Sequence, residues 1–114
     1  MKSGKTYVPH RGDIVWLTFN PQLGHEQEGR RPALVISPKE YNKKAGLALF
    51  CPITSQIKKY PFEVKINEKN IDGVILSDQI KSLDWISRKA SFICKISLGV
   101  LVEVIEKINV LITE

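Results

Sequence analysis

The chain has 114 residues, 43% of them hydrophobic, which is enough for a core of its own, so we expect one domain over residues 1–114. The 17 Lys and Arg against 12 Asp and Glu give a formal charge of +5, which favours a polyanionic partner such as nucleic acid or an acidic polypeptide. No apolar run reaches the ~20 residues of a membrane span and no signal peptide is visible, so we expect a cytoplasmic protein without membrane contact.

The cysteines and histidines predict neither a disulfide nor a metal site. Cys51 and Cys94 lie far apart, each inside an apolar run, and no C-x-x-C motif occurs. His10 and His25 complete no zinc-ligand spacing. We therefore expect two buried thiols in a reducing compartment and no cofactor.

The first third of the chain predicts an arm, a strand and a long loop. Residues 1–10 read as a loose N-terminal arm and 11–13 as a turn. Residues 14–19 predict a strand that is covered on both sides, because both of its alternating faces are largely apolar. The connection over 20–31 shows no periodicity, and loops of this length are usually functional or mobile.

The end of that loop places an arginine at the mouth of a buried strand. Pro32 fixes its own φ and biases Arg31 towards an extended conformation, just before the apolar run 33–36. A guanidinium held in this way is a good phosphate receptor, since its planar fork can bond two oxygens. The alternative interpretation is an arginine that caps the strand end or pairs with Glu26 or Glu28.

Residues 32–53 predict a strand, a short helix and a second buried strand. The strand covers 32–36. Ser37 as N-cap, Pro38 at the first helical position and Glu40 closing a capping box start a helix that ends at Gly46. The continuous apolar run 47–53 predicts a deep strand.

The remaining chain alternates short strands with turns and ends in a helix. A polar, basic loop covers 54–61, and strands are predicted over 62–66, 74–76, 80–83 and 91–94. The stretch 67–73 is turn-rich, and Asp72-Gly73 within it suits a tight turn. Ser97 can cap a helix to about residue 112, with an apolar stripe of Leu101, Ile105, Ile108 and Ile112. The fold class is therefore mainly β: a small, partly open β-barrel with a short helix after the second strand and a C-terminal helix.

Ordered motifs along the chain resemble those of MazF/PemK-type toxins from bacterial type II toxin–antitoxin pairs. The resemblance covers nearly the whole chain from Tyr7. The matching segments are Gly-Asp-Ile-Val-Trp (12–16), Asn-Pro…Gly-His-Glu-Gln…Gly-Arg-Arg-Pro-Ala-Leu-Val-Ile-Ser-Pro (20–38), Tyr-Asn (41–42), Pro-Ile-Thr-Ser-Gln (52–56), Tyr-Pro-Phe-Glu-Val (60–64), Asp-Gly-Val (72–74), Asp-Gln-Ile-Lys-Ser (78–82) and Lys-Ile-Asn-Val-Leu-Ile (107–112).

The resemblance implies an SH3-like barrel, a homodimer and a ribosome-independent endoribonuclease that cuts single-stranded RNA at a short sequence. It implies that Arg31 and Thr54 are catalytic and that Glu26 is important. Two positions depart from the family: Arg30 stands where some relatives have histidine, which puts a histidine-like acid–base role there in doubt, and Leu98-Gly99-Val100 replaces a Pro-Glu-Glu. An ACA-like cut site is a guess from overall similarity.

RNA cleavage without a metal uses the 2′-OH of the substrate as the nucleophile. The enzyme aligns the attack, moves two protons and stabilises the phosphoryl charge. Arg31 and Thr54 suit the charge; a guanidinium is a poor base because it stays protonated. Glu26 is the better general base, with His25 as the second candidate, and a salt bridge from Glu26 to Arg30 or Arg31 is compatible with either.

Several polar side chains on the same loops are candidates for reading the RNA bases. Recognition of unstacked bases needs groups that reach their edges. The predicted RNA-binding residues are His25, Arg30, Gln56, Lys58, Gln79 and Lys81. Trp16 and Trp85 can stack on a base or hold an antitoxin tail, but core or interface positions are the commoner use of tryptophan.

Two other functions fit a barrel of this kind. One is a toxin of the same fold that poisons DNA gyrase, which would not need the Arg-Pro and Thr-Ser-Gln motifs. The other is a non-catalytic RNA-binding barrel, which usually exposes aromatic side chains on a sheet face, whereas the strand pattern here buries them. The expected partners are single-stranded RNA, an acidic antitoxin and a second copy of the chain, since the runs 33–36 and 47–53 and the last helix have excess apolar surface.

Overall fold

The computed structural model describes residues 7–19 and 29–113, and their elements follow the predicted order. The strand and helix bounds differ from the predicted ones by a few residues. The elements are β1 (Asp13–Thr18), β2 (Arg30–Val35), α2 (Lys39–Ala45), β3 (Leu47–Thr54), β4 (Glu63–Glu68), β5 (Ile71–Leu76), β6 (Lys81–Asp84), β7 (Ser91–Lys95) and α3 (Leu98–Thr113).

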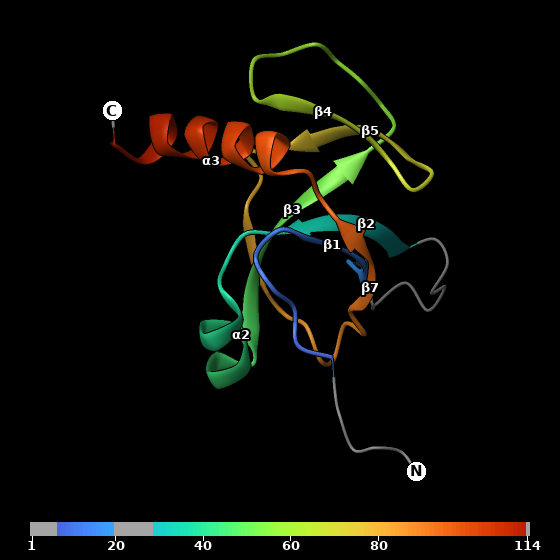
Figure 1. Cartoon of the computed structure of the whole chain (residues 1–114), viewed down its shortest axis with the longest axis vertical. Coiled ribbons are helices and arrows are strands. Elements are labelled where there is room, and N and C mark those ends of the chain that lie inside the picture. The colour runs from blue at the N-terminus through green and yellow to red at the C-terminus, as the bar shows by residue number, and fades with distance from the viewer. Residues whose placement is uncertain (1–6, 20–28, 114) are drawn as a thin grey trace.

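All seven strands form one curled antiparallel sheet in the order β4-β5-β3-β2-β1-β7, with β6 also paired to β3. The long strand β3 connects its two halves. Residues 47–50 pair with β6, 50–52 with β2, and only 53–54 with β5. Figure 1 shows α3 lying against β4 and β5 at one end of the molecule and α2 beside β3 at the other. The predicted fold class, a small and partly open barrel with two helices, is confirmed.

The core lies on both faces of β1, β2 and β3, as the two-sided apolar pattern predicts. Ile14 packs into a cluster that reaches β4, β5 and α3, whereas Val15 and Leu17 pack into a second cluster with Phe50. All four side chains are fully buried. Trp16 differs, because 40% of its surface is exposed. The face of β1 that carries Trp16 is therefore partly open to the surface at that residue.

The start of α2 differs from the predicted capping box. The N-cap is Pro38, and no side chain caps the helix. The Ser37 hydroxyl instead donates to Asn42 Oδ1 and accepts from the Leu49 amide at 2.8 Å. Asn42 is fully buried and its Nδ2 also donates to the carbonyl of Pro9 at 2.8 Å. Ser37 and Asn42 thus join α2 to Pro9 in the N-terminal arm and to Leu49 in β3. The Ser37 hydroxyl is used in these bonds and does not cap the helix. Gly46 does end the helix in the left-handed region, as predicted.

The turn between β4 and β5 lies inside the stretch 67–73 that is predicted as turn-rich, but not at Asp72-Gly73. Lys69 and Asn70 have φ of 48° and 67° and form the turn, whereas Asp72 and Gly73 lie within β5. Asparagine tolerates the left-handed region well, so it competes with Asp-Gly as a turn signal.

Helix α3 buries the face of the predicted stripe only in part: Ile108 is buried as predicted, Val104 is added and Ile112 is not buried. Its buried residues are Val104 and Ile108, with Leu101 and Ile105 only partly covered, and Ile112 is 71% exposed. The helix extends past β4 and β5 (Figure 1), and in its last turns Val110, Leu111 and Ile112 are exposed. Residues 33–36 and 47–53, by contrast, are largely used in the core of the chain itself.

Both cysteines are free and buried, as predicted. Burial, and next the nearby Asp78, raises the pKa of the Cys51 thiol from 9.0 to about 12. Within the described ranges, the structure has no helix that is long and apolar enough to cross a membrane.

Candidate active site

The candidate site lies where β2 and β3 separate. Their ladder ends at the pair Ala33↔Pro52. Beyond it β3 turns to β5, with Thr54 opposite Val74. Prolines at 32 and 52 lack the N–H that a continued ladder would use. Counting on from the last pair in the same register places Arg31 opposite Thr54, and alternation along each strand puts their side chains on the same face.

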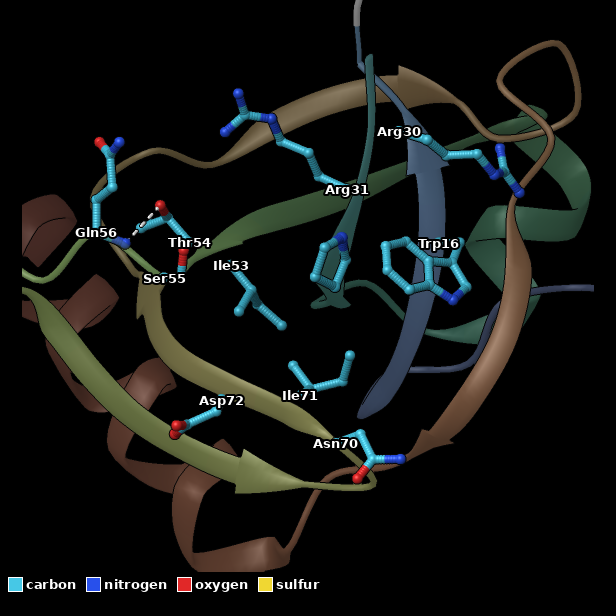
Figure 2. Close-up of a pocket in the computed structure, with 11 residues that line it drawn as sticks. Trp16, Arg30, Arg31, Ile53, Thr54, Ser55, Gln56, Asn70, Ile71 and Asp72 are labelled. Carbon is cyan, nitrogen blue, oxygen red and sulfur yellow. Dashed lines mark hydrogen bonds between the residues drawn. The ribbon is translucent and has the colours of Figure 1, made fainter. Parts of the chain in front are cut away.

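Three surface hollows meet at these two residues. We name them the tryptophan cleft (about 470 Å³), the Lys81 cleft (about 450 Å³) and the Lys58 cleft (about 220 Å³). Arg31 and Thr54 line all three. The tryptophan cleft is also lined by Trp16, Arg30, Pro32, Ile53, Ser55, Gln56, Asn70, Ile71 and Asp72 (Figure 2).

Arg31 is exposed, and within the described ranges its guanidinium has no hydrogen bond or ion pair. Figure 2 shows its side chain extending to the side where Thr54 and Gln56 lie, while Arg30 extends the other way, past Trp16. An unpaired, always-charged guanidinium on a strand beside open cavities is suited to bind an incoming anion.

The hydroxyl of Thr54 has a fixed local role and a free donor. Its Oγ1 accepts a hydrogen bond from the Gln56 amide at 3.1 Å, which is the turn contact expected of threonine here. Because the oxygen is the acceptor, the O–H hydrogen remains available for a ligand.

Gly73 lets β5 approach the Thr54 carbonyl closely. A Cβ on this residue would lie 2.2 Å from Thr54 O and 3.1 Å from Ser55 Cα, and its φ is +154°. Only glycine fits without displacement. The backbone of β5 therefore supports the end of β3 from behind.

The predicted RNA-binding residues of the second half of the chain gather around this centre. Gln56 lines the tryptophan and Lys58 clefts, Lys58 lines the latter, and Gln79 and Lys81 line the Lys81 cleft. The structure brings all four together with Arg31, and their contact with RNA remains a prediction.

Two carboxylates order the loop that carries Lys58. The amides of Lys58 and Lys59 both donate to Glu63, each at 2.9 Å. Tyr60 donates its hydroxyl to Asp78 at 2.8 Å, and desolvation followed by this bond raises the pKa of Tyr60. These hydrogen bonds fix the backbone of the loop beside the Lys58 cleft, while the side chains of Lys58 and Lys59 remain exposed.

The two predicted residues of the first loop, His25 and Glu26, lie outside the described residues. The general base therefore remains as predicted, with Glu26 first and His25 second. In the described part of the chain, no group of three or more His, Cys, Asp or Glu side chains is placed to hold a metal ion.

Comparisons with known proteins identify the family. The model of the PemK-like, MazF-like toxin of type II toxin–antitoxin systems matches residues 10–112. The chain belongs to this family. It is 47% identical over 106 residues to the endoribonuclease toxin MazF of Escherichia coli (strain K12), covering 93% of this chain and 96% of that protein.

Solved structures of the family show the same fold. A crystal structure of MazF from Deinococcus radiodurans superposes with a TM-score of 0.85 at 49% identity, covering 96% of this chain and 100% of that one. A MazE–MazF structure from the same organism has a TM-score of 0.83 at 44% identity, covering 94% and 97%.

Sequence reasoning missed the hydrogen bonds of two arginines beside the site of this MazF-like toxin. Arg30 donates to two side-chain hydroxyls and two backbone carbonyls, and Arg88 donates to the carbonyls of Thr18 and Phe19 at 3.1 and 2.9 Å. The acceptors are mostly main-chain atoms far along the chain, so no residue pattern signals them.

The two tryptophans divide between site and core. Trp85 is buried, and its Nε1 donates to the Asn42 carbonyl at 2.9 Å, so the core interpretation is right for it. Trp16 lines the tryptophan cleft. Phe92 is 49% exposed as well, so the expectation that the strands bury their aromatic residues is wrong. The burial of aromatic residues therefore no longer argues against a non-catalytic RNA-binding barrel. The membership in the toxin family now makes that argument.

Proposed function

We propose that this endoribonuclease toxin of a toxin–antitoxin system cleaves single-stranded RNA, mRNA above all, by attack of the 2′-OH on the adjacent phosphate and without a metal ion. The 2′-O–P bond forms as the P–O5′ bond breaks, leaving a 2′,3′-cyclic phosphate and a 5′-hydroxyl. The observation that supports this proposal most is the position of Arg31. Its guanidinium is unpaired within the described ranges and lies opposite the hydroxyl of Thr54, where the three clefts meet.

Arg31 supplies the charge for the reaction. Its fork can bond two non-bridging oxygens of the phosphate, whose negative charge increases as the 2′-oxygen attacks. Because it lies in β2, its backbone is fixed before the substrate arrives. Thr54 Oγ1 donates to an oxygen of the same phosphate while the Gln56 amide fixes its orientation.

The two proton transfers need further groups. A base removes the proton of the 2′-OH and an acid protonates the leaving 5′-oxygen. We assign the base to Glu26, with His25 as the alternative. The guanidinium of Arg31 is not a suitable base for the 2′-OH, since it remains protonated.

The clefts on either side of the centre suit the flanking nucleotides. Gln56 and Gln79 offer amide donors and acceptors for base edges, and Lys58 and Lys81 offer charge for phosphates. Cleavage at a short sequence in mRNA stops translation and growth.

A fragment assay tests this function. Purified protein is incubated with a long single-stranded RNA, and the products are mapped by primer extension and end-group analysis. Discrete fragments with cyclic-phosphate and 5′-hydroxyl ends are expected. Intact RNA with tight binding would indicate a non-catalytic barrel instead, and inhibition of gyrase with intact RNA would indicate the gyrase-binding function.

The second expected partner is an acidic antitoxin. MazE bound to MazF in the Deinococcus radiodurans structure supports this, together with the charge of +5 and the exposed Arg31, Lys58 and Lys81 around the clefts. A disordered acidic tail would fold over the clefts on binding. Its affinity should fall steeply with salt, and a complex that is salt-insensitive or leaves cleavage intact would contradict this.

The third partner is a second copy of the chain. Helix α3 exposes five large apolar side chains between 44% and 73%: Leu98, Val102, Val110, Leu111 and Ile112. An isologous homodimer is the commonest way to cover such a face. Light scattering at micromolar concentration should give twice the chain mass, and Ile112→Glu should lower it; a single-chain mass for the unmodified protein would refute the dimer.

A further inference from the structure

The two terminal nitrogens of the Arg30 guanidinium are fully occupied by neighbouring parts of the chain. Its Nη1 donates to Thr18 Oγ1 at 2.9 Å and to the Arg88 carbonyl at 3.3 Å. Its Nη2 donates to the Lys89 carbonyl at 2.6 Å and to Ser91 Oγ at 3.1 Å. Each terminal nitrogen of arginine carries two hydrogens, so these four bonds use them all. A phosphate could bond Nη1 or Nη2 of Arg30, and so bind its fork at two points, only by displacing some of these bonds.

A second arginine fastens the same strand ends from the other direction. Arg88 Nη1 donates to the carbonyls of Thr18 and Phe19, and the Thr18 amide donates back to the Arg88 carbonyl at 3.0 Å. The Phe19 amide donates to the Gly29 carbonyl at 2.7 Å, directly before Arg30. We call Arg30, Arg88, Thr18 and Ser91 the arginine clamp. It ties the end of β1 and the start of β2 to the segment before β7.

The clamp bears on Arg31 because the two arginines are neighbours on one strand. Successive side chains of a strand point to opposite faces. Arg30 pairs with Thr18 and Arg31 with Leu17 in the β1–β2 register. Fixing Arg30 on one side therefore fixes the rotation of the strand end, and with it the direction in which Arg31 leaves the backbone. Figure 2 shows this opposition.

The acceptors of Arg30 are all uncharged, so the clamp leaves its positive charge in place beside the cleft. A lysine at position 30 keeps the charge but cannot make the same four bonds. If Arg30 acts by holding the geometry, lysine should not replace it. If Arg30 acts by attracting RNA through its charge, lysine should.

We propose that Arg30 is a positioning residue: through the arginine clamp it aims Arg31 at the reacting phosphate, and it does not itself bind RNA. This goes beyond the proposed function and rests on it for the role of Arg31. It replaces the sequence-based prediction that Arg30 contacts RNA.

The main test is Arg30→Lys, measured as kcat and KM on a short RNA that contains one cut site. A displacement of the catalytic group of about 1 Å costs about 10²-fold in rate. We expect kcat to fall by roughly this factor with KM within about threefold. The matched control is Arg11→Lys, which replaces an exposed arginine bonded to the Ile36 carbonyl at 2.8 Å and lining none of the three clefts. It should leave both constants unchanged.

Two milder variants decide the matter even if Arg30→Lys does not fold. Thr18→Val and Ser91→Ala each remove one acceptor of Arg30, and neither residue lines a cleft. Loss of one bond to a charged donor should lower kcat by about tenfold. A further check combines Arg30→Lys with Arg31→Ala: the double variant should cut no more slowly than Arg31→Ala alone.

The outcomes separate cleanly. A rise in KM with kcat unchanged in Arg30→Lys, unchanged constants in Thr18→Val and Ser91→Ala, or an additive loss in the double variant would each overturn the positioning role. Failure of the unmodified protein to cut RNA, or normal cutting by Arg31→Ala, would overturn the proposed function itself.

Discussion

Replacing Gly73 by alanine should disable the site without touching any predicted catalytic side chain. The added Cβ would lie 2.2 Å from the Thr54 carbonyl oxygen and 2.9 Å from its carbon. Carbon–oxygen contacts between neighbouring strands are ordinarily about 3.3–3.6 Å, so β3 and β5 must separate by roughly 1 Å. Neither contacting atom is a flexible side-chain end, so the backbone of Thr54 has to move.

The size of the effect follows from that displacement. A catalytic group moved by about 1 Å typically loses about 10²-fold in rate. Overpacking adds about 1–3 kcal/mol of destabilisation and the unfavourable φ about the same again. A domain of this size usually has about 5–15 kcal/mol of stability, so Gly73→Ala should still be folded at 25 °C.

Gly46→Ala is the matched control. Gly46 has φ +70° but open space around its Cβ position, so alanine there costs about 1–2 kcal/mol without a clash. Cleavage rates at 25 °C and thermal unfolding are measured for both. We expect both variants to lose stability, Gly73→Ala more than Gly46→Ala, and only Gly73→Ala to lose cleavage rate at a temperature where both are folded. Gly73→Ala cutting within about threefold of the unmodified protein would show that Thr54 does not need this support.

Four further outcomes are expected. Arg31→Ala should lower the cleavage rate by about 10²–10³-fold with the fold and oligomeric mass unchanged, because it removes a charged donor to the developing phosphoryl charge; a loss of only a few-fold would refute its role. Thr54→Ala should cost less, since its donor is neutral, and Thr54→Ser should recover most of the rate; equal rates for alanine and serine would argue against the hydroxyl. Cleavage should persist in EDTA, because guanidinium charge rather than a metal ion stabilises the phosphate, and inhibition that Mg²⁺ reverses would contradict this. The pKa of Cys51 is raised in the folded state, so its contribution to stability is complete below pH 9.0 and is lost towards about pH 12; Cys51→Ala should flatten the fall of the urea midpoint between pH 8 and 10, and an unchanged slope would contradict it.

The features that can be predicted from this sequence are those carried by local pattern. Alternation and apolar runs place the strands and Gly46 ends its helix, whereas the pairing of Arg31 with Thr54 in one site is implied by the family resemblance of the Arg-Pro and Thr-Ser-Gln motifs and not by local pattern. The order of the elements along the chain follows from these patterns, but the pairings of β3 with β5 and β6 and of β1 with β7 join segments that are not consecutive and have no local signal.

The errors lie where distant segments compete with a local rule. Ser37 is taken from its capping position by the buried Asn42, and the turn moves to Asn70 because β5 needs Gly73 against β3. The predicted stripe of α3 includes the buried Ile108 but leaves out the buried Val104 and extends too far, to the exposed Ile112. How far a helix is covered depends on the strands that pack against it, and the helical period does not show this.

The arginine clamp also has a consequence for how such toxins can diverge. Two of the four acceptors of Arg30 are main-chain carbonyls, at positions 88 and 89, and every residue type supplies a carbonyl. A substitution at residue 88 or 89 therefore leaves the acceptor carbonyl in place. For the same reason, it cannot restore the bond after residue 30 has changed. A change at residue 30 can therefore be offset only at Thr18 or Ser91, or by a different way of holding the strand. Pairwise covariation across a set of relatives would therefore miss the bonds to the carbonyls of residues 88 and 89, even where every member depends on them.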